Sequence, residues 1–132
     1  MCNILLISHS LELAKSVYDF ISQMKQKDFK LDYVGGTDHG SKFGSDPLEI
    51  KEKLKQLLQS GTGILVCYDL GSSLLNGQSA VELLENSNDK NKIQFANAAF
   101  VEGSLIAVCS NNDGMTPQQL KTIVENQCHI KK

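Results

Sequence analysis

The chain has 132 residues and a net charge of −2, with 41% hydrophobic and 21% charged residues. This is the size and composition of one folded domain, which we expect to span residues 1–132, and it excludes a disordered or collagen-like chain. The basic residues are all lysine and neither half of the chain is basic, so a nucleic-acid partner is disfavoured. The absence of arginine also removes the usual bidentate clamp for phosphate groups.

The amino-terminal segment and the cysteines favour a reducing, cytoplasmic location. The apolar stretch near Met1 is too short for a signal peptide and has no basic residues before it. No run approaches the roughly 20 apolar residues of a membrane span, so we predict no membrane association. The cysteines form no CxxC pair, and we expect no structural disulfide among Cys2, Cys67, Cys109 and Cys128.

Strand and helix signals alternate along the first half of the chain. Residues Ile4–Ile7 form a continuous apolar run, which predicts a strand covered on both faces. A helix pattern opens at Ser8–Ser10. Its apolar stripe, at helical spacing, consists of Leu13, Val17, Phe20, Ile21 and Met24. Phe29–Val34 is predicted as a second strand. The glycine-rich segment Gly35–Asp46 is predicted as a long loop, and long loops in small domains are often functional.

The alternation continues through the second half. Asp46-Pro47 is a helix start, because an N-cap residue is followed by proline at the first helical position. Gly63–Tyr68 is predicted as a third, buried strand. The next helix is predicted to turn inward Leu74, Val81 and Leu84. Polar residues 86–92 predict a turn, and residues 92–96 predict a weaker fourth strand.

Two more helices complete the pattern. Residues 98–109 are apolar on nearly every face, with Glu102 as the one charge, which predicts a helix buried on two sides and hence a subunit interface. Thr116-Pro117 starts the last helix. The order β-α-β-α-β-α-β-α-α predicts a single-domain α/β fold: an open parallel sheet in the order 2-1-3-4 with helices on both faces.

In such a sheet, ligands bind beyond the carboxyl ends of the strands, at the point where the strand order reverses. Here that point lies between the first and third strands, which are followed by Ser8-His9-Ser10 and by residues 69–73. The sequence contains neither a P-loop nor a dinucleotide fingerprint, and no ligand pair at zinc spacing. We therefore predict no cofactor and no metal, and look to His9 and Asp69 for the chemistry.

A histidine and an aspartate at neighbouring strand ends can carry a phosphoryl group. Neutral imidazole is a nucleophile near pH 7 and can form a phosphoramidate. A carboxylate that accepts a hydrogen bond from one ring nitrogen leaves the lone pair of the other free to attack, which is the role predicted for Asp69 beside His9. Helix starts offer free amides to an anion. The predicted phosphoryl-binding residues are Ser10, Gly71, Ser72 and Ser73.

Each of these residues also has a purely structural interpretation. His9 can be a helix-entry residue, Asp69 an ordinary N-cap, and residues 71–73 an ordinary strand-to-helix turn. For His39, in the glycine-rich loop, a solvated loop residue is the favoured interpretation, and for Cys67 packing is favoured over catalysis. Only the convergence of His9, Asp69 and the helix start at one edge favours function over structure.

Three blocks, in order and at this spacing, resemble one family. They are ISHS after the first strand, YDLGSSLLNGQSAVELL after the third and AAFVEGSLIAV after the fourth. Together they resemble the phosphotransfer subunit of the dihydroxyacetone kinase that depends on the phosphoenolpyruvate phosphotransferase system (PTS). That subunit's EIIA-like domain is of the mannose class, and the resemblance covers essentially the whole chain.

The resemblance implies a phosphotransferase component acting as a relay. Phosphate from phosphoenolpyruvate would pass through enzyme I and the phosphocarrier HPr to His9, and then to ADP held by the nucleotide-binding kinase subunit. Asp69 would orient His9, residues 71–73 would line the phosphoryl pocket, and the domain would be a homodimer. Some family members carry fused HPr-like and enzyme I-like domains, so here we expect the donor to arrive as a separate protein.

Two alternatives stay open. One is a mannose-class EIIA component of a sugar transporter, which keeps the chemistry and changes the acceptor. The other is a non-catalytic regulatory module that binds an anion or a metabolite in the same crevice. The role of the loop Gly35–Asp46 is not assigned, although its Gly44-Ser45 pair resembles a Gly-[Ser/Thr] pair found near a helix start in the family.

Overall fold

The computed structural model describes residues 1–128 and contains a four-stranded sheet in which all paired strands run parallel. The strands are β1 (Asn3–Ser8), β2 (Leu31–Gly35), β3 (Ile64–Tyr68) and β4 (Ile93–Ala96). Their order is β2-β1-β3-β4, which confirms the predicted topology. Strands β1 and β3 lie in the middle and are buried along their whole length, which explains why both are continuous apolar runs.

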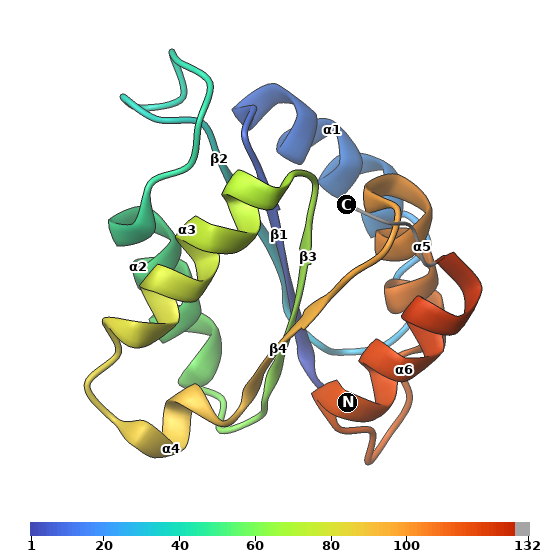
Figure 1. Ribbon diagram of the computed structural model, residues 1–132. Coiled ribbons are helices and arrows are strands. Elements are labelled where there is room, and N and C mark those ends of the chain that lie inside the picture. The colour runs from blue at the N-terminus through green and yellow to red at the C-terminus, as the bar shows by residue number, and fades with distance from the viewer. Residues whose placement is uncertain (129–132) are drawn as a thin grey trace.

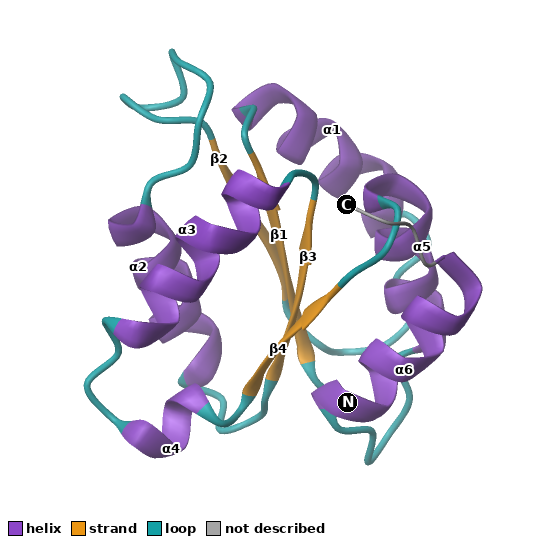
Figure 2. Cartoon of the chain, in the orientation of Figure 1, coloured by secondary structure: helices purple, strands orange, loops and turns teal. Residues whose placement is uncertain are grey.

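Helices cover both faces of the sheet, as Figures 1 and 2 show. The helices are α1 (Leu11–Ser22), α2 (Pro47–Leu58), α3 (Gly71–Glu82), α4 (Ser87–Lys90), α5 (Phe100–Ser110) and α6 (Pro117–Cys128). Helices α2 and α3 pack on one face, and α1, α5 and α6 pack on the other. Each face therefore has its own apolar core. Within residues 1–128, no helix combines the length and the apolar character needed to cross a membrane.

The predicted helix starts are confirmed by their caps. The hydroxyl of Ser10 accepts a hydrogen bond from the amide of Leu13 at the start of α1. The carboxylate of Asp46 accepts one from the amide of Leu48, and Pro47 is the first residue of α2. Both caps satisfy amides that have no partner within their own helix. The predicted turn at 86–92 contains the single-turn helix α4.

The predicted apolar stripe of α1 is only half buried. Val17 and Ile21 face the core together with Ala14. The other members of the predicted stripe are exposed: Leu13 and Phe20 on α1, and Met24 just after the helix ends. The apolar arc of this helix is wider than the strip that the sheet can cover, so spacing alone overstated the buried face. The surplus leaves apolar side chains on the outer surface of α1.

Helix α5 differs in a related way from the two-sided burial predicted for residues 98–109. Its buried face carries small residues that let it pack close to its neighbours: Gly103, Ser104, Ala107 and Val108. Cys109 is exposed on the opposite side, and Val101 and Glu102 are exposed in the first turn. Within one chain α5 is therefore buried on one face only, and its other side carries Glu102 among apolar residues.

The glycine-rich segment after β2 is a loop, as predicted, and it is held by its own backbone pairs. Isolated bridges join Gly36 to Ser45 and Thr37 to Lys42. Asp38 and His39 both have positive φ angles, 55° and 59°, a conformation that asparagine, aspartate and histidine adopt more readily than most residues. The segment is thus a compact hairpin-like excursion, and it projects at the carboxyl end of the sheet (Figure 1).

Candidate functional site

His9 and Asp69 meet at the carboxyl edge of the sheet. His9 directly follows β1, and Asp69 directly follows β3. These two strands pair with each other, and the amide of Asp69 continues the ladder by donating to the carbonyl of Ile7 at 3.2 Å. The topology alone therefore brings together two residues that are far apart in the sequence. The position is the predicted switch point between the first and third strands.

The histidine ring is oriented by the carboxylate. His9 Nδ1 lies 2.5 Å from Asp69 Oδ2, and the backbone amide of His9 donates to the same oxygen at 3.1 Å. A carboxylate can only accept hydrogen bonds, so Nδ1 carries the proton and Nε2 keeps its lone pair. The side chain of His9 is 33% exposed while that of Asp69 is 7% exposed. The imidazole is thus partly exposed while its carboxylate partner is buried.

Further donors hold Asp69 in its charged form. Ser8 Oγ donates to Oδ2 at 2.8 Å, while Ser73 Oγ and the amide of Leu70 donate to Oδ1, each at 2.7 Å. Burial of this carboxyl raises its pKa, but the hydrogen bonds from Ser73, His9 and Ser8 outweigh burial and lower the pKa below its ordinary value. Asp69 is therefore a carboxylate at neutral pH, ready to stabilise positive charge on the imidazole.

The residues predicted to bind the phosphoryl group lie at the carboxyl end of the sheet, but they differ in exposure and in their hydrogen bonds. Ser10 caps α1, with its hydroxyl on the amide of Leu13. Gly71 and Ser72 are exposed at the first turn of α3. Ser73 is fully buried and its hydroxyl donates to Asp69, so it positions the carboxylate. A role for these residues in holding phosphate stays a prediction.

The first amides of α3 have no acceptor within their own helix, and those of Gly71 and Ser72 belong to exposed residues. The N-cap residue is Leu70, whose side chain has no group that can accept a hydrogen bond. The first helical hydrogen bond is donated by the amide of Leu74 to the carbonyl of Leu70. The amides of residues 71–73 precede it and carry the positive end of the helix dipole.

The loop after β2 supplies contacts that the sequence analysis did not foresee. The amide of Gly44 donates to the carbonyl of His9 at 2.7 Å. The ring of Phe43 lies beside the ring of His9, with centroids 5.8 Å apart and planes inclined by 50°. Ser8 was also missed as a partner of Asp69, although its place beside His9 in the ISHS block is a usable signal. Nothing in the local sequence points to Phe43.

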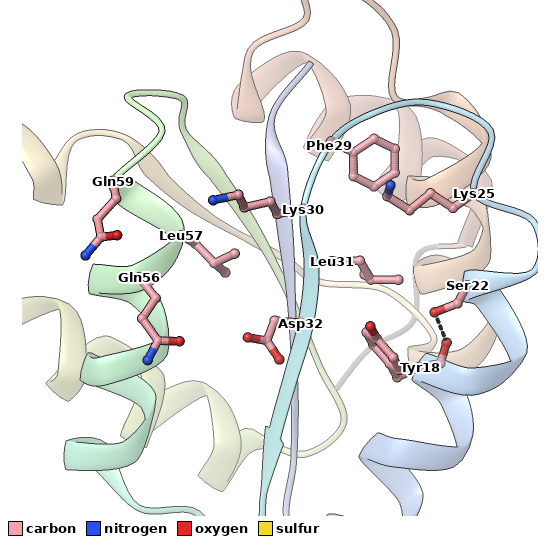
Figure 3. Close-up of a pocket in the computed structure, with 10 residues that line it drawn as sticks. All are labelled: Tyr18, Ser22, Lys25, Phe29, Lys30, Leu31, Asp32, Gln56, Leu57 and Gln59. Carbon is pink, nitrogen blue, oxygen red and sulfur yellow. Dashed lines mark hydrogen bonds between the residues drawn. The ribbon is translucent and has the colours of Figure 1, made fainter.

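A groove of about 510 Å³ lies elsewhere, along β2 at the outer strand of the sheet. Figure 3 shows that side chains of α1, β2 and α2 line it, with Lys25, Lys30 and Asp32 as its charged groups. It contains neither His9 nor Asp69. Asp32 is already paired with Lys53 at 3.2 Å. This groove therefore adds nothing to the chemistry at His9. Among residues 1–128, no three His, Cys, Asp or Glu side chains group so as to hold a metal ion.

Comparisons with known proteins place this geometry in a family context. Residues 3–121 match the EIIA-man family, described as the PTS system fructose IIA component. The chain is 34% identical over 112 residues to the phosphoryl donor subunit DhaM of the phosphoenolpyruvate (PEP)-dependent dihydroxyacetone kinase of Klebsiella michiganensis. That match covers 83% of this chain and 23% of the relative.

Shorter relatives and a solved structure match over more of their length. The chain is 31% identical over 101 residues to the phosphoryl donor subunit DhaM of PEP-dependent dihydroxyacetone kinase 1 of Listeria innocua, covering 76% of this chain and 74% of that protein. The crystal structure of EF1359, a protein of unknown function, matches with a TM-score of 0.82 and 27% identity over 98% of this chain and 96% of that one. The chain thus spans about a quarter of the Klebsiella relative (23%) and most of the Listeria one (74%).

Proposed function

The chain belongs to the EIIA-man family, the PTS system fructose IIA component, as a DhaM-like member, and on this basis we propose that it is a phosphohistidine carrier. In this proposal His9 receives phosphate from HPr and passes it to ADP bound on the nucleotide-binding subunit of dihydroxyacetone kinase. The observation that carries the proposal is the hydrogen bond between His9 Nδ1 and the buried Asp69 carboxylate, which leaves the lone pair on Nε2 of a side chain that is one third exposed.

The first transfer is a displacement at phosphorus. The lone pair of His9 Nε2 forms the new N–P bond as the P–N bond of the donor phosphohistidine breaks, and the electron pair of that bond returns to the donor ring. The Nδ1 proton stays on His9, in its hydrogen bond to Asp69. The ring of His9 becomes positively charged, and the adjacent carboxylate stabilises this charge as it develops.

The phosphoryl group itself needs partners for its negative charge. The exposed amides of Gly71 and Ser72 at the start of α3 and the hydroxyl of Ser72 are suited to this role. The chain has no arginine, so no guanidinium of its own can contribute. In the second transfer the roles reverse: the terminal oxygen of ADP attacks phosphorus, and the N–P bond electrons return to Nε2.

The proposal is tested by intact mass after mixing the chain with phosphoenolpyruvate, enzyme I and HPr. We expect the gain of one phosphoryl group that is labile in acid. The gain should disappear in His9→Ala and persist in His39→Ala, a matched control because His39 is exposed in the loop. Absence of any gain with active enzyme I and HPr would refute the carrier proposal and favour a regulatory module that binds an anion in the crevice.

The identity of the acceptor needs a separate measurement. Phosphorylated chain is mixed either with the ADP-loaded kinase subunit or with the EIIB component of a mannose-class transporter. We expect loss of the phosphoryl group and formation of ATP only in the first mixture. Transfer only to EIIB would overturn the kinase assignment while leaving His9 as the carrier. The proposed partners place the relay in the cytoplasm.

A homodimer is part of the proposal. Helices α1 and α5 pack against each other and carry the exposed apolar side chains of Leu13, Phe20 and Val101, and Met24 is exposed just beyond the end of α1. Exposed apolar side chains gathered on neighbouring helices are typical of an interface. Sedimentation equilibrium should give twice the chain mass, and Phe20→Lys should shift the chain toward monomer. A wild-type monomer at high concentration would refute this part alone.

A further inference from the structure

The loop between β2 and α2 packs against the segment that carries His9 and forms backbone hydrogen bonds to it. The amide of Gly36 donates to the carbonyl of Ser8 at 3.4 Å, and the amide of Gly44 donates to the carbonyl of His9 at 2.7 Å. A side chain at Gly40 would collide with Leu11, the first residue of α1. The backbone of His9 is thus held by Asp69 through its amide and by the loop through its carbonyl.

The same loop is tied to the helix that supports Asp69. Asn76 Nδ2, on α3, donates to Ser45 Oγ at 2.6 Å, and Ser45 is buried. Ser73, one turn earlier on α3, donates to Asp69. The loop, the start of α1 and the start of α3 therefore form one connected unit around His9, which fixes the position from which Phe43 projects.

Phe43 is the unusual member of this unit. Its side chain is 80% exposed, although its ring lies 5.8 Å from the ring of His9. Asp69 holds the imidazole at Nδ1, and the phenyl ring of Phe43 occupies space beside the same ring. Aromatic pairs at this separation attract each other, and a phenyl ring also keeps water from the side that it covers.

We propose that Phe43 is a positioning residue for His9, which keeps the imidazole on Asp69 and shields phospho-His9 from water. This inference rests on the proposed function, because a carrier is useful only if its phosphoryl group survives between donor and acceptor. In hydrolysis, water forms a bond to phosphorus and the P–Nε2 bond breaks with its electrons returning to the ring. Inorganic phosphate and unmodified His9 result, and the proton released goes to the buffer.

The test compares Phe43→Ala with wild type after phosphorylation by phosphoenolpyruvate, enzyme I and HPr and removal of these donors. Intact mass at pH 8 follows the loss of the phosphoryl group with time. We expect the alanine variant to lose its phosphoryl group about 3- to 10-fold faster. This factor corresponds to the free energy that one aromatic contact typically contributes. Phe43→Tyr keeps the ring and should restore the wild-type lifetime.

The matched control is Leu48→Ala. Leu48 is an apolar side chain that is 64% exposed, near the same loop, in the first turn of α2. Its truncation removes comparable apolar surface and should leave the phosphoryl lifetime unchanged. Faster hydrolysis in Leu48→Ala as well would mean that any loss of apolar surface has this effect, which overturns the specific role of Phe43.

A second readout does not need phosphorylation. Nitrogen-15 NMR of the His9 ring in the unmodified protein reports which nitrogen carries the proton. Wild type should show the Nδ1–H form, and Phe43→Ala should show a measurable Nε2–H population. Wild-type values for Phe43→Ala in both measurements would overturn the proposal. So would a variant whose only change is a higher KM for HPr, because Phe43 would then be a docking residue. If wild type accepts no phosphate, the proposed function fails and the NMR result still decides the role of Phe43.

Discussion

Replacing Asp69 by Asn is the sharpest test of the His9–Asp69 pair. The carboxylate accepts from His9 Nδ1, the amide of His9 and Ser8 at Oδ2, and from Ser73 and the amide of Leu70 at Oδ1. Asparagine has the same shape but offers one oxygen and one NH₂ group. One of the two sets of donors therefore loses its acceptor, and the negative charge beside the imidazole disappears.

The size of the effect follows from the lost charge. A carboxylate and an imidazolium with charge centres roughly 4 Å apart attract each other by about 4 kcal/mol at the effective dielectric of a partly exposed site. This attraction acts only when the ring becomes positive, during transfer, so it lowers the barrier. Its loss should slow transfer by roughly 10²- to 10³-fold. His9 remains present, so the phosphoryl group should still attach to it, slowly.

The assay is rapid quench of the reaction between phospho-HPr and the chain, read by intact mass. The control is Asp32→Asn, the same chemical change at a carboxylate on β2 that pairs with Lys53 of α2, away from His9. It should transfer at the wild-type rate. Circular dichroism checks that both variants fold. A folded Asp69→Asn that transfers within about threefold of wild type would refute the proposed role of the carboxylate, since threefold is well under 1 kcal/mol.

Three further predictions concern stability. The pKa of Asp69 is lowered in the folded state, so its ionised carboxylate stabilises the fold above the unfolded pKa, and this stabilisation is lost as pH falls through the folded pKa. In urea unfolding from pH 7 to pH 3, the free energy of unfolding should therefore fall less steeply for Asp69→Asn than for wild type. Ser73→Ala removes a buried donor to a charged group and should cost about 1.5–3 kcal/mol in urea unfolding; a cost below about 0.5 kcal/mol would contradict the buried hydrogen bond. Gly35→Ala would place a Cβ 2.8 Å from the carbonyl oxygen of Ser10 and should cost about 1–3 kcal/mol, whereas Gly71→Ala meets nothing within 4 Å and should not destabilise; equal melting temperatures for the two variants would refute this distinction.

The sequence by itself determined the architecture and the centre of the site. Continuous apolar runs identify strands buried on both faces. Helix patterns between them imply parallel pairing, because each helix returns the chain to the end of the sheet where the previous strand began. From this order, His9 and Asp69 fall at adjacent strand ends, and the structure brings them within 2.5 Å. These features depend on patterns within single elements and on a topology with few alternatives, so no knowledge of distant contacts was required.

The tertiary structure alone decided how the surroundings of His9 are used. Ser73 turns inward to Asp69, although its place in a Gly-Ser-Ser helix start is equally suited to a ligand. Phe43 and Gly44 reach His9 from a loop whose path depends on backbone pairing across the loop and on a hydrogen bond to α3. Whether Phe20 on α1 is covered depends on how far the sheet extends beneath it. Such contacts join residues with no common period in the sequence, so packing determines them and local patterns do not.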